Sequence, residues 1–289
     1  MTRFTTGAVT VRVPATSANL GPGFDSLGLA LALHDEVTAE VTGDGVVVEV
    51  RGEGEGNLPA DETHLVARAA FLAFDRIGAR PAGLRLSCLN RIPHARGLGS
   101  SSAAIVAGIS LAAALCPDAG FGLDARLRLA GEIEGHPDNV APCLLGGFTI
   151  AWTDGDGSRA VRLEPAPGVA PVVYVPAGQG LTAHARAALP GRVPHVDAAY
   201  NVGRAALLVH AITAAPELLL EATDDRIHQQ YRSATMARSA ALVAELRHQG
   251  VPAAISGAGP SVIAFGDAPG DVDGFEAFKL AVAEGASVI

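Results

Sequence analysis

The chain has 289 residues, of which 49% are hydrophobic and only 4% aromatic, and its formal net charge is −9. This length predicts one large or two modest domains with a core built mainly from Ala, Val, Leu and Ile. An acidic chain without a basic or aromatic patch is a poor candidate for binding nucleic acid or an anionic membrane, so we expect neither partner.

The first half of the chain combines strands with helices. A strand at 8–14 alternates valine with other residues, and a loop rich in Gly, Pro and Asn follows at 15–23. Helical periodicity is present at 64–77 and 123–133, and an uncharged, alanine-rich helix is expected to end at Leu115. Further strands are predicted over 27–33, 36–41, 46–51, 83–89 and 147–152.

The second half repeats this mixture after a segment rich in Gly, Asp and Pro at 154–168, which indicates a domain boundary. Because strands and helices do not alternate regularly, the fold class is predicted to be α+β, with domains at 1–155 and 156–289. The strands are predicted over 171–175, 253–256 and 261–265, and the helices over 182–189, 195–214 and 233–248.

Membrane, targeting and disulfide signals are weak. Residues 97–117 carry no charge, but their apolar part at 103–115 is too short to span a membrane and predicts a buried helix. The N-terminus lacks the apolar run of a signal peptide. The cysteines are odd in number and well separated, which argues against structural disulfides or a zinc site and favours a cytoplasmic location: Cys88, Cys116 and Cys143.

Lysine occurs once, as Lys279, so arginine supplies the remainder of the 21 basic residues. The chain therefore has no lysine-containing phosphate loop, no strand lysine of the protein-kinase kind and no candidate Schiff-base lysine. A nucleotide phosphate would have to be bound by backbone amides, hydroxyl groups, a metal ion and arginine. Lys279 lies outside every motif, and we expect no function for it.

The strongest local signal is a glycine-serine loop between a predicted strand and a predicted helix. Backbone N–H groups at a helix N-terminus attract anions, and glycines let the backbone approach a phosphate closely. A serine-capped buried helix is the alternative, but three serines in a row after a turn led by proline favour phosphate binding. The loop consists of Pro93, His94, Ala95, Arg96, Gly97, Leu98, Gly99, Ser100, Ser101, Ser102 and Ala103.

Two further clusters are open to more than one interpretation. The segment 256–261, Ser-Gly-Ala-Gly-Pro-Ser, fits a tight turn between strands as well as it fits a binding loop. The segment 16–25 places Asn19 and Asp25 beside a rigid turn. This polar pair suits hydrogen bonding to the hydroxyl or amino group of a small substrate, and it fits turn capping equally well.

Taken together, the three clusters resemble the three motifs of the GHMP kinases, in order, from about residue 8 to about residue 266. The glycine-serine loop is similar to the ATP loop of that family. Two segments resemble the homoserine kinase branch. They are 14–25, Pro-Ala-Thr-Ser-Ala-Asn-Leu-Gly-Pro-Gly-Phe-Asp, and 134–142, Glu-Gly-His-Pro-Asp-Asn-Val-Ala-Pro. Family members often have Asn where this chain has His64, so we assign no role to that residue.

The resemblance implies a fold and an activity. It implies an N-terminal ATP-binding domain, a C-terminal ferredoxin-like domain and a substrate between them, in a homodimer. The implied reaction is the ATP-dependent phosphorylation of L-homoserine to O-phospho-L-homoserine, a step toward threonine. There are two alternatives. One is a GHMP kinase for another small alcohol, such as mevalonate or shikimate, and the other is a non-catalytic protein that senses a metabolite.

The resemblance also implies roles for single residues. The glycine-serine loop would wrap the triphosphate of ATP, and Ser101 and Glu132 would hold Mg²⁺, with Glu134 as the alternative to Glu132. Asn139 cannot accept a proton, so it would orient the substrate hydroxyl for direct attack on the γ-phosphate. The residues implied for homoserine are Asn19, Asp25, His136, Asn139, Arg186 and Arg232.

In this implied site, Asp25 would accept hydrogen bonds from the substrate ammonium. Arg186 and Arg232 would hold the carboxylate, because a guanidinium group binds a carboxylate with two parallel hydrogen bonds. An ordinary surface arginine is the alternative at each of the two positions.

Overall fold

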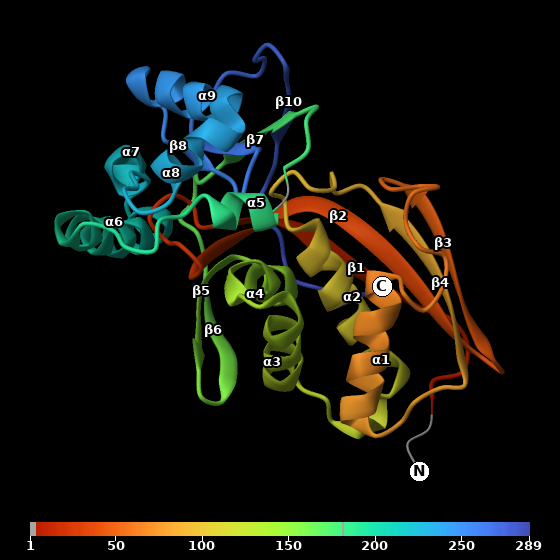
Figure 1. Cartoon of the computed structure of the whole chain (residues 1–289). Helices are drawn as coiled ribbons and strands as arrows, with labels where there is room; N and C mark the ends of the chain where they lie inside the picture. The colour runs from red at the N-terminus through yellow and green to blue at the C-terminus, as the bar shows by residue number, and fades with distance from the viewer. Residues whose placement is uncertain (1–3, 181) are drawn as a thin grey trace.

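The computed structural model describes residues 4–180 and 182–289 and contains two sheets with helices packed on them (Figure 1). This arrangement confirms the α+β class. Residues 1–3, at the N-terminus where the sequence shows no apolar run, lie outside the described residues. Among the residues described, no helix is long and apolar enough to cross a membrane.

The larger sheet has seven strands, and all neighbouring pairs except β3 with β4 are antiparallel. Its strands are β1 (Val9–Ala18), β2 (Leu27–Thr42), β3 (Gly45–Gly52), β4 (Gly83–Asn90), β5 (Phe148–Asp154), β6 (Gly157–Leu163) and β11 (Ser287–Val288). The order is β11-β1-β2-β4-β3, and β5 pairs with both β2 and β6.

The first two strands are longer than the sequence predicts. The predicted strands 27–33 and 36–41 form one strand, β2, because His34 and Asp35 stay paired with Pro14 and Val13 of β1. A register shift after Pro14 absorbs the irregularity, and β1 then continues to Ala18 inside the predicted loop. The chain therefore enters the first glycine-rich turn directly from a paired strand, which fixes the position of that turn.

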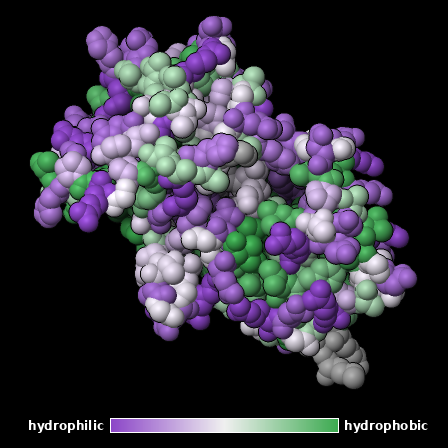
Figure 2. Space-filling model, in the orientation of Figure 1, coloured by the Kyte–Doolittle hydropathy of each residue, from purple (hydrophilic) through white to green (hydrophobic). Residues whose placement is uncertain are grey.

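Four helices cover one face of the larger sheet (Figure 1). They are α1 (Leu65–Ile77), α2 (Ser100–Leu115), α3 (Leu123–Glu134) and α4 (Pro137–Leu145). The uncharged helix α2 is buried along most of its length because it packs against α1, α3, α4 and β1. Figure 2 shows hydrophobic side chains gathered on the visible face over α1 and α2. The sequence did not predict α4, which holds a proline at its start and a second proline inside.

The smaller sheet contains β7 (Pro171–Pro176), β8 (Ala253–Ile255), β9 (Val262–Phe265) and β10 (Phe275–Lys279), in the antiparallel order β10-β7-β9-β8. Its helices are α5 (Thr182–Ala187), α6 (His195–Thr213), α7 (Leu219–Ala222), α8 (Gln229–Arg232) and α9 (Ala237–His248). The predicted helix 233–248 begins as a 3₁₀ turn, Ser233–Met236, and further 3₁₀ turns are Pro117–Ala119 and Pro216–Leu218.

The core is aliphatic, as the composition predicts, and the smaller sheet contributes to it from one face. Val173 and Val175 of β7 join the main core, whereas Val172 and Tyr174 face a second core under α9. This division follows the two-residue period of a strand. The two sheets are therefore joined by a shared core.

The predicted division after residue 155 lies in the turn of a hairpin. Along its whole length β6 pairs with β5, from Phe148 opposite Leu163 to Asp154 opposite Gly157. The end of the chain also returns to the larger sheet, because β11 pairs with β1. The segment rich in Gly, Asp and Pro thus contains both a hairpin turn of the larger sheet and the passage to the smaller one.

Candidate active site

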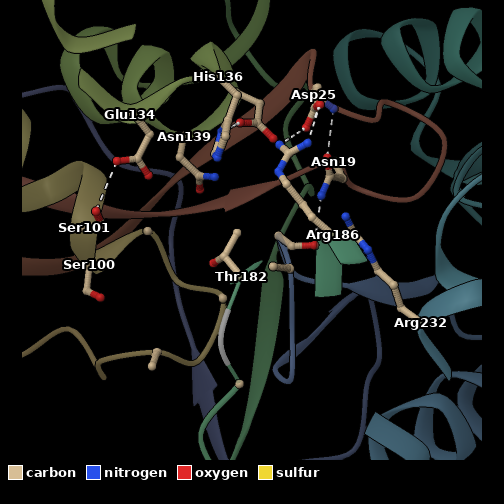
Figure 3. A pocket seen from close by; sticks show the side chains of 17 residues that line it. Asn19, Asp25, Ser100, Ser101, Glu134, His136, Asn139, Thr182, Arg186 and Arg232 are labelled. Carbon is tan, nitrogen blue, oxygen red and sulfur yellow. Dashed lines mark hydrogen bonds and ion pairs between the residues drawn. The ribbon is translucent and has the colours of Figure 1, made fainter. Parts of the chain in front are cut away.

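A cavity of about 250 Å³ lies where the three glycine-rich segments meet (Figure 3). Most of the residues that the resemblance implied for the substrate and metal line this one cavity, although they come from distant parts of the chain. They are Asn19, Asp25, Ser101, His136, Asn139, Arg186 and Arg232.

Hydrogen bonds join the three glycine-rich segments. Asn19 Nδ2 donates to the carbonyl oxygen of Gly257 at 2.8 Å, and Ser256 Oγ donates to that of Gly97 at 2.7 Å. A Cβ atom on Gly97 would lie 2.3 Å from the carbonyl oxygen of Ser256, and Gly97 has a φ of +76°. The segment 256–261 is thus a turn between β8 and β9 that also forms a wall of the cavity.

The glycine-serine loop ends in the N-terminus of α2. The N-cap residue is Gly99, with a φ of 70°, and glycine has no side chain with which to cap the helix, which argues against the serine-cap alternative. A Cβ atom on Gly99 would lie 1.9 Å from Thr16 Oγ1, so only glycine fits there. The amides of the first turn are consequently available to an anion beside the cavity.

Not every residue of the loop lines this cavity. Leu98 is buried in the main core. The Arg96 guanidinium donates to the carbonyl oxygens of Pro176 and Ala177, so it ties the loop to the end of β7. Together with Pro93, Arg96 lines a separate groove. The loop residues that line the cavity itself are Ala95, Gly97, Gly99, Ser100 and Ser101.

A second cavity, of about 330 Å³, adjoins the loop and shares Ser100 and Ser101 with the first. His94 and Ala103 also line it, and its other walls are mainly apolar. His64 lies in this second cavity, where its Nδ1 accepts a hydrogen bond from the first turn of α1 and its Nε2 is buried without a partner among the described residues.

The structure corrects the choice of Glu132 as the acidic neighbour of Ser101. Glu132 points to the opposite side of α3, where its carboxylate accepts hydrogen bonds from Arg76 at 2.7 and 2.9 Å. Glu134 faces the loop instead, accepting from Ser101 Oγ at 3.1 Å and from Ser102 Oγ at 2.9 Å. Residues two apart on a helix point in nearly opposite directions, so only one of the two glutamates can face the loop.

Asn139 has a fixed orientation. Its Oδ1 accepts a hydrogen bond from Thr16 Oγ1 at 2.8 Å, inside a buried part of the site. The amide N–H₂ group is therefore the end that remains to donate into the cavity. Thr16 lies in the first glycine-rich segment, although no sequence pattern singled it out.

His136 and Asp138 form a second polar pair next to Asn139. His136 Nδ1 and Asp138 Oδ1 are 2.6 Å apart. Burial works against protonation of His136, but the hydrogen bond to Asp138 and the charges of Asp138 and Glu134 outweigh it and raise the pKa of His136. Asp138 was not predicted as a site residue, although it lies between two residues that were.

The far end of the cavity from the loop is charged (Figure 3). The Arg186 guanidinium forms two hydrogen bonds with the Asp25 carboxylate, at 2.7 and 3.0 Å. Arg232 is 2% exposed, which excludes the surface-arginine alternative at that position. Both guanidinium groups lie over the ring of Phe24, at 5.6 Å for Arg186 and 5.2 Å for Arg232. The wall also includes Thr182, at the start of α5, which no sequence pattern indicated.

Comparison with known proteins places this site in a family. The model of the GHMP kinases N terminal domain matches residues 64–147, and the model of the GHMP kinases C terminal matches residues 204–277. A homoserine kinase of Streptomyces avermitilis is 56% identical over 99% of this chain and 97% of its own length. A homoserine kinase of Streptomyces coelicolor is 58% identical over 92% of this chain and 86% of its own length.

Solved structures agree with the sequence relatives. A homoserine kinase from Cytophaga hutchinsonii superposes with a TM-score of 0.86 at 26% identity and covers 98% of this chain and 97% of its own. A putative homoserine kinase from Listeria monocytogenes has a TM-score of 0.76 at 32% identity, over 97% and 99% of the two chains. The chain belongs to the GHMP kinase family and, within it, to the homoserine kinases.

Proposed function

We propose that the protein transfers the γ-phosphoryl group of ATP to the side-chain hydroxyl of L-homoserine, giving O-phospho-L-homoserine and ADP. The observation that carries this proposal is a single cavity with an anion-binding helix N-terminus at one end and both an acidic and a basic side chain at the other. An amino acid with a hydroxyl group matches the charged end, and a nucleotide phosphate matches the loop.

The nucleotide is proposed to bind across the loop. Its triphosphate would accept hydrogen bonds from the amides of the first turn of α2, beside Ser100 and Ser101, which border both cavities. The mainly apolar second cavity would take the base. This division needs no lysine, which agrees with the composition of the chain.

The residues at the loop fit a magnesium ion. Ser101 and Glu134 supply a hydroxyl and a carboxylate oxygen 3.1 Å apart, and Mg²⁺ takes few protein oxygens together with phosphate oxygens and water. When bound, the ion supplies positive charge against the phosphate oxygens. In the described ranges, 4–180 and 182–289, no three His, Cys, Asp or Glu side chains gather to form an all-protein metal site.

Homoserine is proposed to bind by exchange of charge partners. Asp25 and Arg186 are paired with each other in the structure. A zwitterion offers an ammonium to Asp25 and a carboxylate to Arg186, so neither charge loses its partner when the pair opens. Arg232 would be the second guanidinium on the carboxylate. Mevalonate and shikimate each carry a carboxylate but no ammonium, so Asp25 would lose Arg186 without gaining a replacement partner, which favours an amino acid.

Phosphoryl transfer is proposed to depend on the position of the substrate hydroxyl. The N–H₂ group of Asn139 would donate to the hydroxyl oxygen and aim it at the γ-phosphorus, because Thr16 holds the other end of that amide. The hydroxyl oxygen forms a bond to phosphorus, the bond from phosphorus to the bridging oxygen of ADP breaks, and the hydroxyl proton passes to water. A strong base is not required for phosphoryl transfer, and the amides of α2 stabilise the charge on the phosphate oxygens.

An ADP-release assay tests the proposal. The purified chain is mixed with Mg-ATP and, in separate reactions, with L-homoserine, mevalonate, shikimate or galactose. We expect turnover with L-homoserine alone. Turnover with one of the other alcohols and none with L-homoserine would refute the substrate while leaving the kinase fold intact. The homodimer and the cytoplasmic location stay predictions.

A further inference from the structure

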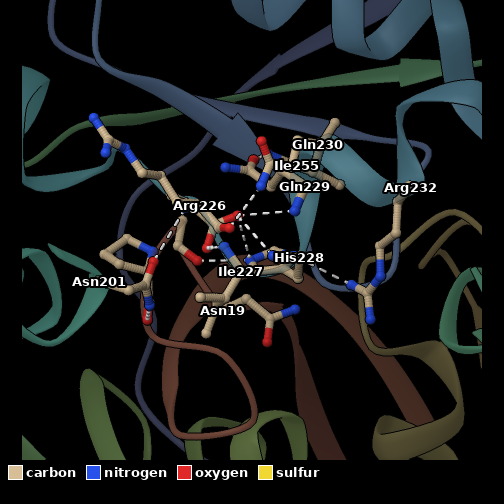
Figure 4. A network of polar contacts seen from close by, with 12 residues as sticks. Asn19, Asn201, Arg226, Ile227, His228, Gln229, Gln230, Arg232 and Ile255 are labelled. Atoms are coloured by element: carbon tan, nitrogen blue, oxygen red, sulfur yellow. Dashed lines mark hydrogen bonds and ion pairs between the residues drawn. The ribbon is translucent and has the colours of Figure 1, made fainter. Parts of the chain in front are cut away.

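His228 lies in a buried polar network beside the cavity (Figure 4), although no sequence pattern singled it out. Its side chain is 0% exposed, and it comes just before α8, the short helix that ends in Arg232. The preceding Asp225 fixes this segment, because its carboxylate accepts hydrogen bonds from the backbone N–H groups of Ile227, His228 and Gln229. The backbone that carries the His228 ring is therefore fixed in position.

The contacts of the His228 ring determine its tautomer. Nε2 lies 2.7 Å from the carbonyl oxygen of Gly21, which can only accept, so Nε2 carries the proton. Nδ1 lies 3.4 Å from Nη1 of Arg232, which can only donate, so Nδ1 is the acceptor. Burial lowers the pKa of His228, in opposition to the charge of Asp225, and keeps the ring neutral.

Arg232 depends on few contacts for its orientation. Its Nε donates to the carbonyl oxygen of Ala185 at 3.1 Å, and its Nη1 donates to His228. The guanidinium plane also lies over Phe24, whose ring is 5.1 Å from that of His228. Within the described ranges these are the hydrogen bonds that Arg232 makes through its side chain, which leaves Nη2 for a ligand in the cavity.

We infer that His228 is a positioning residue that aims Arg232 at the substrate carboxylate, with Gly21 of the first glycine-rich turn as its anchor. The imidazole contacts a turn of the larger sheet through one nitrogen and Arg232, near the smaller sheet, through the other. It therefore sets the distance between the two walls that hold the amino acid. This inference rests on the proposed function, because it assigns Arg232 to the carboxylate.

Two substitutions distinguish the role of Nε2 of His228 from the role of Nδ1. His228→Gln keeps an N–H donor near the Nε2 position for Gly21 and removes the acceptor for Arg232. His228→Asn keeps an oxygen acceptor near the Nδ1 position and removes the donor for Gly21. We expect His228→Gln to raise the KM for L-homoserine about tenfold, with the KM for ATP and kcat within about twofold of the wild type. In His228→Asn the KM for L-homoserine should stay within about threefold of the wild type.

Asn201→Ala is the matched control. Asn201 is also buried, and it joins the same turn to the same segment, donating to the carbonyl oxygen of Pro22 and accepting from the N–H of Arg226. It makes no hydrogen bond to Arg232 within the described ranges. Its loss should destabilise the protein without raising the KM for homoserine more than about twofold. A KM increase equal to that of His228→Gln would mean that general loosening of the turn causes the effect, and would overturn the inference.

A second substrate localises the effect. The alcohol 3-amino-1-propanol is homoserine without its carboxylate, so its KM should be high in the wild type and should not change in His228→Gln. An unchanged KM for homoserine in His228→Gln, or an equal increase for both alcohols, refutes the role of His228. If His228→Gln does not fold, a tenfold increase in the KM for homoserine in His228→Asn refutes the role of His228. A wild type that does not phosphorylate homoserine refutes the proposed function instead.

Discussion

Replacing Glu134 by Gln tests the corrected position of the acidic residue at the phosphate loop. The carboxylate of Glu134 accepts hydrogen bonds from two consecutive serine hydroxyls, at 3.1 and 2.9 Å. An amide of the same shape can accept only through its oxygen, so one serine loses its acceptor. The substitution also removes the negative charge that would accompany Ser101 on a metal ion.

The size of the effect follows from what the residue touches. A single group that stabilises the charge of a transition state is worth about 10²- to 10³-fold in kcat, or roughly 3–4 kcal/mol. We expect Glu134→Gln to lose activity by this amount and to require a higher Mg²⁺ concentration for half-maximal rate. ADP binding measured by calorimetry with and without Mg²⁺ should show a smaller difference between the two conditions than in the wild type.

Glu132→Gln is the control. Glu132 pairs with Arg76 on the surface, and the two side chains are 60% and 54% exposed, so the pair contributes only about 0–1 kcal/mol to stability. Its loss should leave kcat and the Mg²⁺ dependence unchanged and shift Tm by no more than about 4 °C. A large loss of activity in Glu132→Gln with normal activity in Glu134→Gln would refute the placement of α3 against the loop.

Three other substitutions test separate parts of the structure. Asn139→Leu removes the orienting amide, so kcat should fall by orders of magnitude while calorimetry shows unchanged ATP binding; an unchanged kcat would reject this role. Gly99→Ala places a Cβ atom 1.9 Å from Thr16 Oγ1 and should abolish ATP binding, whereas normal binding would contradict the tight loop. Folding raises the pKa of Asp35 to about 6, chiefly by burial, from 3.8. Because the folded chain binds this proton more tightly, the contribution of Asp35 to the free energy of unfolding falls by about 3 kcal/mol as the pH rises from about 4 to about 6. Asp35→Asn should remove this loss and stabilise the chain at pH 7 in urea unfolding; an equal difference at pH 4 and pH 7 would contradict the shift.

The sequence predicted the elements whose signals are local. The glycine-serine loop was visible because glycines and consecutive serines between a strand and a helix are typical of a phosphate-binding turn, and the uncharged helix ended at Leu115 as predicted. Pairing between distant segments was not visible. The strands β10 and β11 depend on partners in β7 and β1, more than 90 residues away in the chain, and their own composition carries no strong strand signal.

The error at Glu132 has a physical cause. Sequence spacing placed both glutamates near the end of one helix, but the phase of that helix decides which side chain faces α2. Helix α3 packs against α2, and Leu127 and Ala130 of α3 are buried in the main core. Glu134 is four residues beyond Ala130 and lies on the same side of the helix, whereas Glu132, two residues beyond Ala130, points away from that side. A motif gives the residue types that a site needs, and packing selects the one that reaches it.

The scarcity of lysine has a counterpart in the charges of the cavity. The phosphate end offers neutral donors, whereas the other end holds two guanidinium groups and the carboxylates of Asp25 and Asp138. Burial and the nearby charge of Arg186 lower the pKa of Arg232, in opposition to the charges of Asp25, Asp225 and Asp138, so Arg232 is a buried positive charge that an anionic ligand would stabilise. A substrate carboxylate would neutralise that charge, and its ammonium would replace Arg186 as the partner of Asp25. The arrangement would therefore select for both charged groups of an amino acid at once and would leave the hydroxyl for Asn139 to orient.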